Sequence, residues 1–217
     1  PGESFTVETE DANNGKMRST EELPTFENIP EAFEYPPRVN PVAGPIFIEG
    51  VEKGDILVVK VGKIAPDAQG ATALLLGAGP LFDSVKWQSC NGPYTHIIKH
   101  LPGPSGTTRD GVGVFKEGVT WNLDPFIGTI GTAPPYGENL SSGWGQGPWG
   151  GNIDCRHIRE GANIYINCYH EGGLLFLGDV HASQADTEIS GIADETRAEV
   201  QVSCEVIKDR SIPSLRI

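Results

Sequence analysis

Residues 198–207 read Ala-Glu-Val-Gln-Val-Ser-Cys-Glu-Val-Ile, the longest strict alternation of apolar and polar residues in the chain. Because side chains of a strand alternate between its two faces, Val200, Val202 and Cys204 fall on the same face. The stretch therefore predicts a strand with one face in the core and the other in solvent.

Shorter apolar runs, broken by glycine, proline and aspartate, predict further strands. They cover residues 4–9, 45–49, 55–61, 163–168, 174–177 and 189–193. Residues 50–54 join two of these runs in a hairpin-like connection. Helix signals are weak, because Pro24 and Pro30 interrupt residues 21–33 and only residues 71–76 form a helix-compatible apolar cluster. We therefore expect an all-β protein with a β-sandwich-like core and long Gly/Pro-rich loops.

Two segments do not fit the strand pattern. Residues 81–110 mix aromatic residues, prolines and two histidines, which predicts an elaborated loop or lid. Residues 125–154 hold eight glycines together with Trp144 and Trp149. A flexible linker is the alternative there, but linkers rarely carry two tryptophans, so we expect a surface where backbone approaches a ligand. We treat residues 1–217 as one domain with these two insertions.

The composition argues against several classes of protein. The chain of 217 residues has 16 Lys and Arg against 29 Asp and Glu, a net charge of −13, and no basic cluster, so nucleic acid is not an expected partner. No apolar run is long enough for a membrane span, and no secretion signal is recognisable. The four scattered cysteines lack a Cys-x-x-Cys pair and predict reduced thiols in the cytoplasm, with a disulfide as the alternative. The abrupt start at Pro1 and end at Ile217 suggest a piece of something longer, or one chain of a two-chain unit.

The densest group of ionisable residues is Gly-Asp-Val-His-Ala-Ser-Gln-Ala-Asp-Thr-Glu, residues 178–188. His181 can bind a metal through its neutral imidazole, and Asp179, Asp186 or Glu188 can supply carboxylate oxygens. Asp186 and Glu188 are two residues apart, so they would share a face of an extended segment. One carboxylate could then bind a metal while the other accepts a proton. A charged surface loop is the alternative interpretation.

Two smaller groups of polar residues add to this one. Residues 150–154 read Gly-Gly-Asn-Ile-Asp, in which Asn152 and Asp154 share a parity and the glycines permit a close approach. A turn closed by a side-chain hydrogen bond is the alternative there. Residues 8–12 form an acidic cluster that includes Asp11 and follows the first predicted strand.

With these motifs the chain resembles the acetamidase/formamidase family, whose members hydrolyse short-chain amides to the acid and ammonia. The matching stretches occur in the same order and spacing, at residues 40–45, 49–50, 55, 125–135, 150–154, 178–188 and 191. The sequence departs from the family at Trp149, where many members have His, and at Thr187, where many have Gly. Members also usually have more chain before Pro1 and after Ile217.

The resemblance implies a divalent metal near these loops, with zinc preferred and calcium as the alternative. It also implies a homo-oligomer, or a second chain that completes the fold. We expect the metal ligands to be Asp11, His181 and Asp186. We expect the catalytic residues to be Glu188, which moves protons, together with Asn152 and Asp154. We expect the substrate or its oxyanion to contact Gly150, Gly151 and Gln184.

The predicted function is therefore hydrolysis of a small formamide-like or acetamide-like substrate by metal-activated water. A non-catalytic β-sandwich module that binds a ligand or a partner chain is the alternative, because a fold does not by itself establish chemistry.

Overall fold

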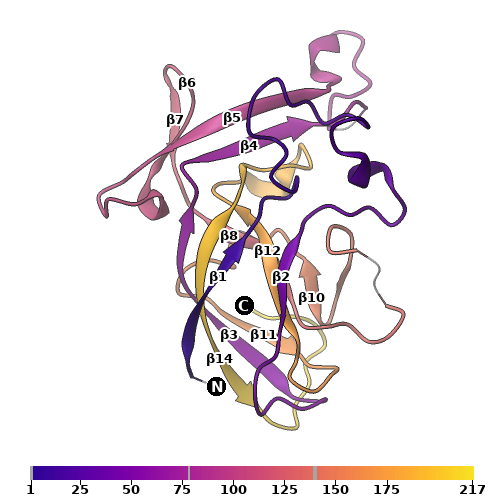
Figure 1. Cartoon of the computed structure of the whole chain (residues 1–217), viewed down its shortest axis with the longest axis vertical. Coiled ribbons are helices and arrows are strands. Elements are labelled where there is room, and N and C mark those ends of the chain that lie inside the picture. The colour runs from indigo at the N-terminus through magenta and orange to yellow at the C-terminus, as the bar shows by residue number, and fades with distance from the viewer. Residues whose placement is uncertain (1, 78, 139–140) are drawn as a thin grey trace.

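The computed structural model of the chain describes residues 2–77, 79–138 and 141–217 and consists almost entirely of strands and loops (Figure 1). The strands in these ranges are β1 (Ser4–Thr9), β2 (Val42–Ile46), β3 (Ile56–Pro66), β4 (Gln69–Leu74), β5 (Tyr94–Leu101), β6 (Val112–Lys116), β7 (Val119–Asn122), β8 (Phe126–Gly131), β9 (Gln146–Gly147), β10 (Gly150–Asn152), β11 (Asn163–Asn167), β12 (Leu175–His181), β13 (Glu195–Thr196) and β14 (Ala198–Ile207). Short 3-10 helices lie in the connections: η1 (Pro30–Phe33), η2 (Gln88–Cys90), η3 (Thr108–Asp110) and η4 (Asp186–Glu188). The all-β prediction is confirmed.

The strands form two antiparallel sheets. The smaller has the order β1-β14-β3-β11, and the larger has the order β7-β6-β5-β4-β13-β12-β8-β10-β9, with β2 beside β12. The strand predicted at residues 198–207 is β14, which pairs with both β1 and β3. Val200, Val202 and Cys204 are buried while Glu199 alternates with them in solvent, as the sequence pattern predicted.

One apolar core joins the two sheets. The smaller sheet contributes residues such as Val59, Ile164 and Val200, and the larger sheet contributes residues such as Ile130 and Leu177. Packing of two antiparallel sheets over a shared apolar core is the sandwich arrangement expected from the sequence. Figure 1 shows β3, β11 and β14 at one end of the molecule and β4 to β7 at the other.

Several local predictions were wrong. Segment 81–110 contains β5, whose alternation is hidden from a hydropathy reading because the polar residues Thr95 and His100 are buried in it. Segment 125–154 contains β8, β9 and β10, and the apolar cluster at residues 71–76 lies largely in β4. Residues 189–193 form a turn and irregular backbone, not a strand.

The predicted hairpin around residues 50–54 is also wrong. The strand before this connection is β2, which pairs antiparallel with β12 and not with β3. The pairing is close at Gly44, where an added Cβ would lie 2.7 Å from the carbonyl oxygen of Leu175. Glycine at this position thus lets β2 join the sheet that carries the site described below.

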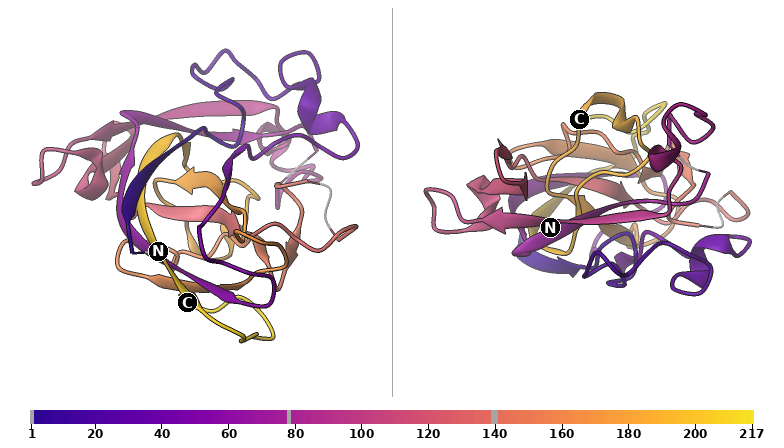
Figure 2. Two further views of the ribbon diagram at one scale, coloured as in Figure 1. Left: turned by 60° about the horizontal axis from the view of Figure 1, so that its bottom comes forward. Right: turned by 90° about the horizontal axis from the view of Figure 1, so that it is seen from above.

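A long N-terminal segment lies on one side of the sheets. Residues 10–41, drawn in indigo and violet, run along that side in the right-hand view of Figure 2. The segment is attached to the larger sheet: Thr95 Oγ1 donates a hydrogen bond to the carbonyl oxygen of Glu22 at 2.8 Å. It brings residues 12–13 and 29–40 to the edge of the site.

All four cysteines, Cys90, Cys155, Cys168 and Cys204, are unpaired. Within the described ranges, no helix has the length and apolar character needed to cross a membrane.

Candidate active site

Five ionisable side chains gather at the end of β12. Asp179 and His181 belong to β12, and Glu195 lies opposite His181 in β13. Asp154 follows β10, and Glu188 ends η4. The ligand atoms of Asp154, Asp179 and His181 lie within 4.8 Å of one another, as do those of His181, Glu188 and Glu195. These residues, called the His181 cluster below, line one part of a cavity of about 290 Å³.

Three carboxylate oxygens of the cluster are buried without a hydrogen-bond partner in the described part of the chain: Asp154 Oδ1, Asp179 Oδ1 and Glu195 Oε2. They lie 3.9, 3.4 and 3.3 Å, respectively, from Nε2 of His181. Buried polar atoms without partners are costly and rare in folded proteins. The arrangement therefore requires positive charge close to Nε2.

The other oxygens of two of these carboxylates are anchored. Asn40 Nδ2 donates a hydrogen bond to Asp179 Oδ2 at 2.9 Å, and the Thr129 hydroxyl lies 3.0 Å from the same oxygen. The backbone N–H of Ala193 donates to Glu195 Oε1 at 2.9 Å. In Asp179 and Glu195, one carboxylate oxygen is thus held by hydrogen bonds, and the other oxygen points toward His181.

The hydrogen-bond network around Gln184 assigns the tautomer of His181. Gln184 Nε2 donates to the backbone carbonyl of Asp154 at 3.1 Å, and a carbonyl can only accept. Gln184 Oε1 therefore faces His181 Nδ1, at 2.7 Å, and accepts a hydrogen bond from its N–H. In the neutral imidazole the lone pair is then on Nε2, directed at the carboxylate oxygens.

A lone pair facing three carboxylate oxygens repels them unless a proton or a cation lies between. One imidazole nitrogen with several carboxylate oxygens is a donor set that suits a divalent transition metal such as zinc. An imidazole whose second nitrogen is hydrogen-bonded to a neighbouring group is also the common arrangement of a metal-binding histidine. The residues present therefore fit a divalent cation.

The pKa values of the cluster follow from its burial and charge. Burial raises the pKa of Asp154 to about 7, and the nearby Asp179 charge adds to the shift. Burial likewise raises the pKa of Glu195 to about 7. Burial alone would lower the pKa of His181, but the charges of Glu195 and Asp179 raise it well above its ordinary value. Burial also opposes ionisation of Asp179, yet the charge of His181 and the hydrogen bonds to Asp179 together outweigh it, so the pKa of Asp179 is lowered.

We expect a divalent cation to bind more tightly as the pH rises from 6 to 8. A metal binds the deprotonated ligands, and the raised pKa values of Asp154, Glu195 and His181 mean that protons must leave first. Affinity is then lost as the pH falls through about 7, by about tenfold per pH unit for each proton displaced. Calorimetric titration of metal-stripped protein with zinc at pH 6, 7 and 8 measures this, and an affinity independent of pH would contradict it.

Gly128 on β8 makes the close approach of two carboxylates possible. A Cβ built there would lie 2.7 Å from Asp154 Oδ1 and 2.9 Å from Asp179 Oδ2. It would also lie 2.6 Å from the backbone oxygen of Asp179, closer than real Cβ contacts come. The absence of a side chain at position 128 therefore sets the separation of Asp154 and Asp179.

We expect Gly128→Ala to weaken retention of a divalent cation at least about tenfold, because both carboxylates must move. Elemental analysis after dialysis against a graded series of chelator concentrations measures the loss. Gly113→Ala on β6 is the matched control, since its Cβ would meet the Trp121 ring at 2.9 Å, outside the cluster. Equal metal retention by the two variants would contradict the role assigned to Gly128.

The structure brings some of the residues predicted from sequence to the cavity. Asp154, His181 and Glu188 belong to the cluster, and Asn152 lines the same cavity. Asn152 Nδ2 donates a hydrogen bond to the carbonyl oxygen of Gly143 at 3.2 Å, so its Oδ1 faces the Thr129 hydroxyl, 2.7 Å away.

Three other predicted residues, Gly150, Gly151 and Gln184, do not line the cavity. Gly150 and Gly151 are buried in the pairing of β10 with β8, where a Cβ on either would clash with backbone of Ile130 or Gly145. Their lack of a side chain thus serves close strand pairing. Gln184 contacts Nδ1 of His181, the ring nitrogen that does not face the carboxylates of the cluster.

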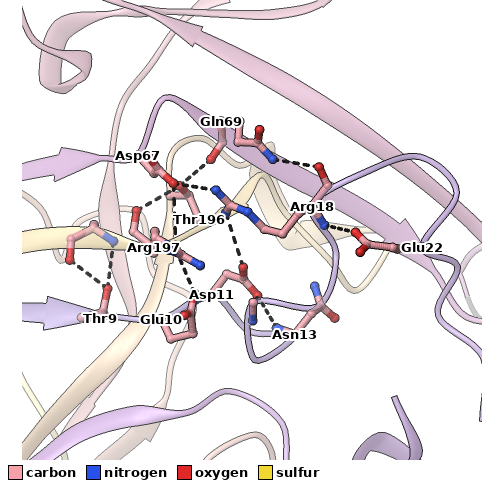
Figure 3. A network of polar contacts seen from close by, with 12 residues as sticks. Thr9, Glu10, Asp11, Asn13, Arg18, Glu22, Asp67, Gln69, Thr196 and Arg197 are labelled. Carbon is pink, nitrogen blue, oxygen red and sulfur yellow. Dashed lines mark hydrogen bonds and ion pairs between the residues drawn. The ribbon is translucent and has the colours of Figure 1, made fainter. Parts of the chain in front are cut away.

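Asp11 and Asp186 lie outside the cluster. The Asp11 carboxylate accepts hydrogen bonds from the backbone N–H groups of Asn13 and Gly15, at 2.9 and 3.0 Å. It also lies 3.9 Å from Arg18, in the polar network of Figure 3. Asp11 therefore holds the turn that places Asn13 at the cavity.

The prediction that Asp186 and Glu188 share a face is wrong. They lie in η4, where Thr187 has the left-handed φ of 69° and breaks the expected alternation. The carboxylate of Asp186 is 82% exposed and pairs with Arg156, while Glu188 turns to the cavity.

Three site residues were missed as ligands or anchors: Asn40, Thr129 and Glu195. Asp179 was named as one of three possible oxygen donors but was not preferred, although it precedes His181 by two residues in a strand and so shares its parity. Glu195 gave no local signal, since it reaches His181 only through the pairing of β13 with β12.

Comparison with known proteins identifies what the chain is similar to. The profile of the acetamidase/formamidase family matches residues 145–214. A formamidase from Methylophilus methylotrophus is 27% identical, over 96% of this chain and 60% of its own length. The crystal structure of an acetamidase from Bacillus halodurans is 32% identical with a TM-score of 0.82, over 99% of this chain and 66% of that one. A predicted acetamidase/formamidase from Thermoanaerobacter tengcongensis is 33% identical with a TM-score of 0.83, over 99% of this chain and 64% of that one.

Proposed function

We propose that this chain, which is similar to acetamidases and formamidases, hydrolyses a carboxamide to the carboxylic acid and ammonia at the His181 cluster. The observation that carries the proposal is the set of three buried carboxylate oxygens around Nε2 of His181 that have no hydrogen-bond partner among the described residues. The chain spans about 60% of the length of the formamidase that it matches, so the activity is proposed for this part of such a protein.

In this proposal, His181, Asp179 and Glu195 hold a divalent cation, with Asp154 beside them. The imidazole nitrogen favours zinc over calcium, which prefers an all-oxygen site. When bound, the cation lowers the pKa of water and polarises the amide carbonyl. The chain's own contribution is to fix the donors: Asn40 and Thr129 orient Asp179, and Gln184 orients His181.

Glu188 is the proposed proton carrier. It is only half-buried, it lines the cavity, and burial raises the pKa of its carboxyl above the ordinary value. Asp179 and Glu195, in contrast, are each anchored by hydrogen bonds. Glu188 accepts a proton from the attacking water and donates it to the amide nitrogen, so that the C–N bond breaks and ammonia leaves.

Two asparagine side chains are proposed to bind the substrate carbonyl. Asn152 lines the cavity beside Asp179. Asn13 also lines it, and its Nδ2 is buried without a hydrogen-bond partner in the described ranges. Asn13 Nδ2 can therefore donate a hydrogen bond to the carbonyl oxygen of the substrate. Negative charge develops on this oxygen when water attacks the carbonyl carbon.

The test uses the purified chain, stripped of metal and reloaded with zinc or calcium. We expect ammonia release from formamide or acetamide, together with one retained divalent cation per cluster. If neither ammonia nor a stoichiometric cation is found, the chain is a binding module. The homo-oligomer and the cytoplasmic location expected from the sequence stay predictions.

A further inference from the structure

The cavity beside the His181 cluster is larger than a small amide requires. Its volume of about 290 Å³ is roughly ten times the ~30 Å³ that one water molecule occupies in the liquid. Acetamide has four non-hydrogen atoms and would fill less than half of it. The remaining lining is largely apolar and includes Ile29, Val39, Leu75 and Trp144.

A second hollow continues this apolar lining toward solvent. It has a volume of about 560 Å³ and is lined by residues that include Phe33, Tyr35 and Pro36. It shares Ala32, Pro37 and Trp144 with the cavity, so the two spaces adjoin. We call this second hollow the aromatic groove.

The side chains of the aromatic groove are unusually exposed for their type. Tyr35 is 91% exposed, Trp144 76% and Phe33 48%. Contiguous exposed apolar groups of this kind mark binding surfaces. Because the groove opens from the cavity that holds the cluster, its occupant is expected to be the same molecule that reaches the cluster.

The charges of the groove argue against an anionic occupant. The charged residues of its lining are Glu34 and Glu138. Glu34 pairs with Arg38, whose Nε lies 2.6 Å from the carboxylate, so this guanidinium already has a partner. An acyl group that carries its own carboxylate would meet no free cation among these lining residues, whereas a neutral apolar group fits them.

We propose that the substrate is a primary carboxamide with an extended, neutral, apolar acyl group. Its amide lies at the His181 cluster, and its alkyl or aryl-alkyl part passes Trp144 into the aromatic groove. This inference rests on the proposed function, and it names the substrate class of the same site.

The test compares kcat/KM for straight-chain primary amides from acetamide to octanamide with the metal-loaded protein. We expect kcat/KM to rise about fourfold for each added methylene, the factor that corresponds to about 0.8 kcal/mol of apolar burial. Values that stay flat or fall beyond acetamide would overturn the inference and leave the proposed function intact.

Binding measured without turnover separates the two proposals. Tryptophan fluorescence measures amide binding directly. Octanamide should bind more tightly than acetamide, whether or not the protein also hydrolyses them. Chain-length-dependent binding without hydrolysis would reject the proposed function and support the groove. Hydrolysis of acetamide with no dependence of binding or turnover on chain length would support the proposed function and reject the inference about the groove.

Variants locate the effect in the groove. Trp144→Ala and Phe33→Ala should each lower the ratio of octanamide to acetamide kcat/KM about tenfold. Tyr136→Ala is the matched control: Tyr136 is 96% exposed, and its ring packs against His170 at a centroid distance of 5.4 Å, outside the groove lining. An equal change in all three variants, or in none, would overturn the inference.

Discussion

Replacing Glu188 by glutamine is expected to slow amide hydrolysis about 100-fold or more, with the divalent cation still bound. Glutamine keeps the size and polarity of the side chain but has no basic oxygen, so it cannot take up the proton of water. Single-turnover measurements should place the loss in the chemical step. Substrate binding should change little, because the amide can still form hydrogen bonds.

Asp186→Asn is the matched control for this variant, since it removes a carboxylate two residues away in the same turn. The exposure of Asp186 and its pairing with Arg156 predict little change in turnover or in metal content. If Asp186→Asn lost the cation instead, the metal role first expected from the sequence would be restored. If Glu188→Gln lost the cation, Glu188 would be a ligand and not the proton carrier.

His181→Ala is expected to abolish retention of the cation and to lower turnover at least about 100-fold. The substitution removes the one nitrogen donor of the cluster and leaves the free oxygens of Asp179 and Glu195 facing each other. Elemental analysis and ammonia release measure the two effects separately.

The control for His181→Ala is His170→Ala. His170 Nε2 donates a hydrogen bond to the carbonyl oxygen of Pro134, and its ring packs against Tyr136, away from the cluster. We expect it to retain the cation and turnover. Unchanged metal content and turnover in His181→Ala would show that His181 is only a packed core histidine.

The strands that sequence reasoning found are those whose burial follows hydropathy. β14 was predicted with its observed bounds, because Val200, Val202 and Cys204 are buried and the glutamate and glutamine residues that alternate with them are exposed. β5 was missed, because Thr95 and His100 are buried by specific partners: Thr95 bonds to Glu22, and His100 pairs with Asp194 at 3.1 Å. Long-range partners of this kind leave no trace in the local pattern.

The same distinction separates the site residues. His181 was recognised from its acidic neighbours, and Asp179 follows from strand parity. Glu195 reaches the cluster through the pairing of β13 with β12. Asn40 reaches it through a hydrogen bond to Asp179, which is 139 residues away in the sequence. Asp186 was favoured over them because an extended backbone was assumed, and the left-handed φ of Thr187 removes that assumption.

The pairing of β1 with β14 also has a consequence for how the chain folds. Ser4 lies opposite Ser203 and Thr9 opposite Ala198, and the Thr9 hydroxyl donates to the Ala198 carbonyl at 3.3 Å across a separation of 189 residues. During synthesis, β1 therefore cannot pair with β14 until the residues that separate the two strands have left the ribosome. Such non-local pairing slows folding and leaves the edge of β1 unpaired until β14 is available.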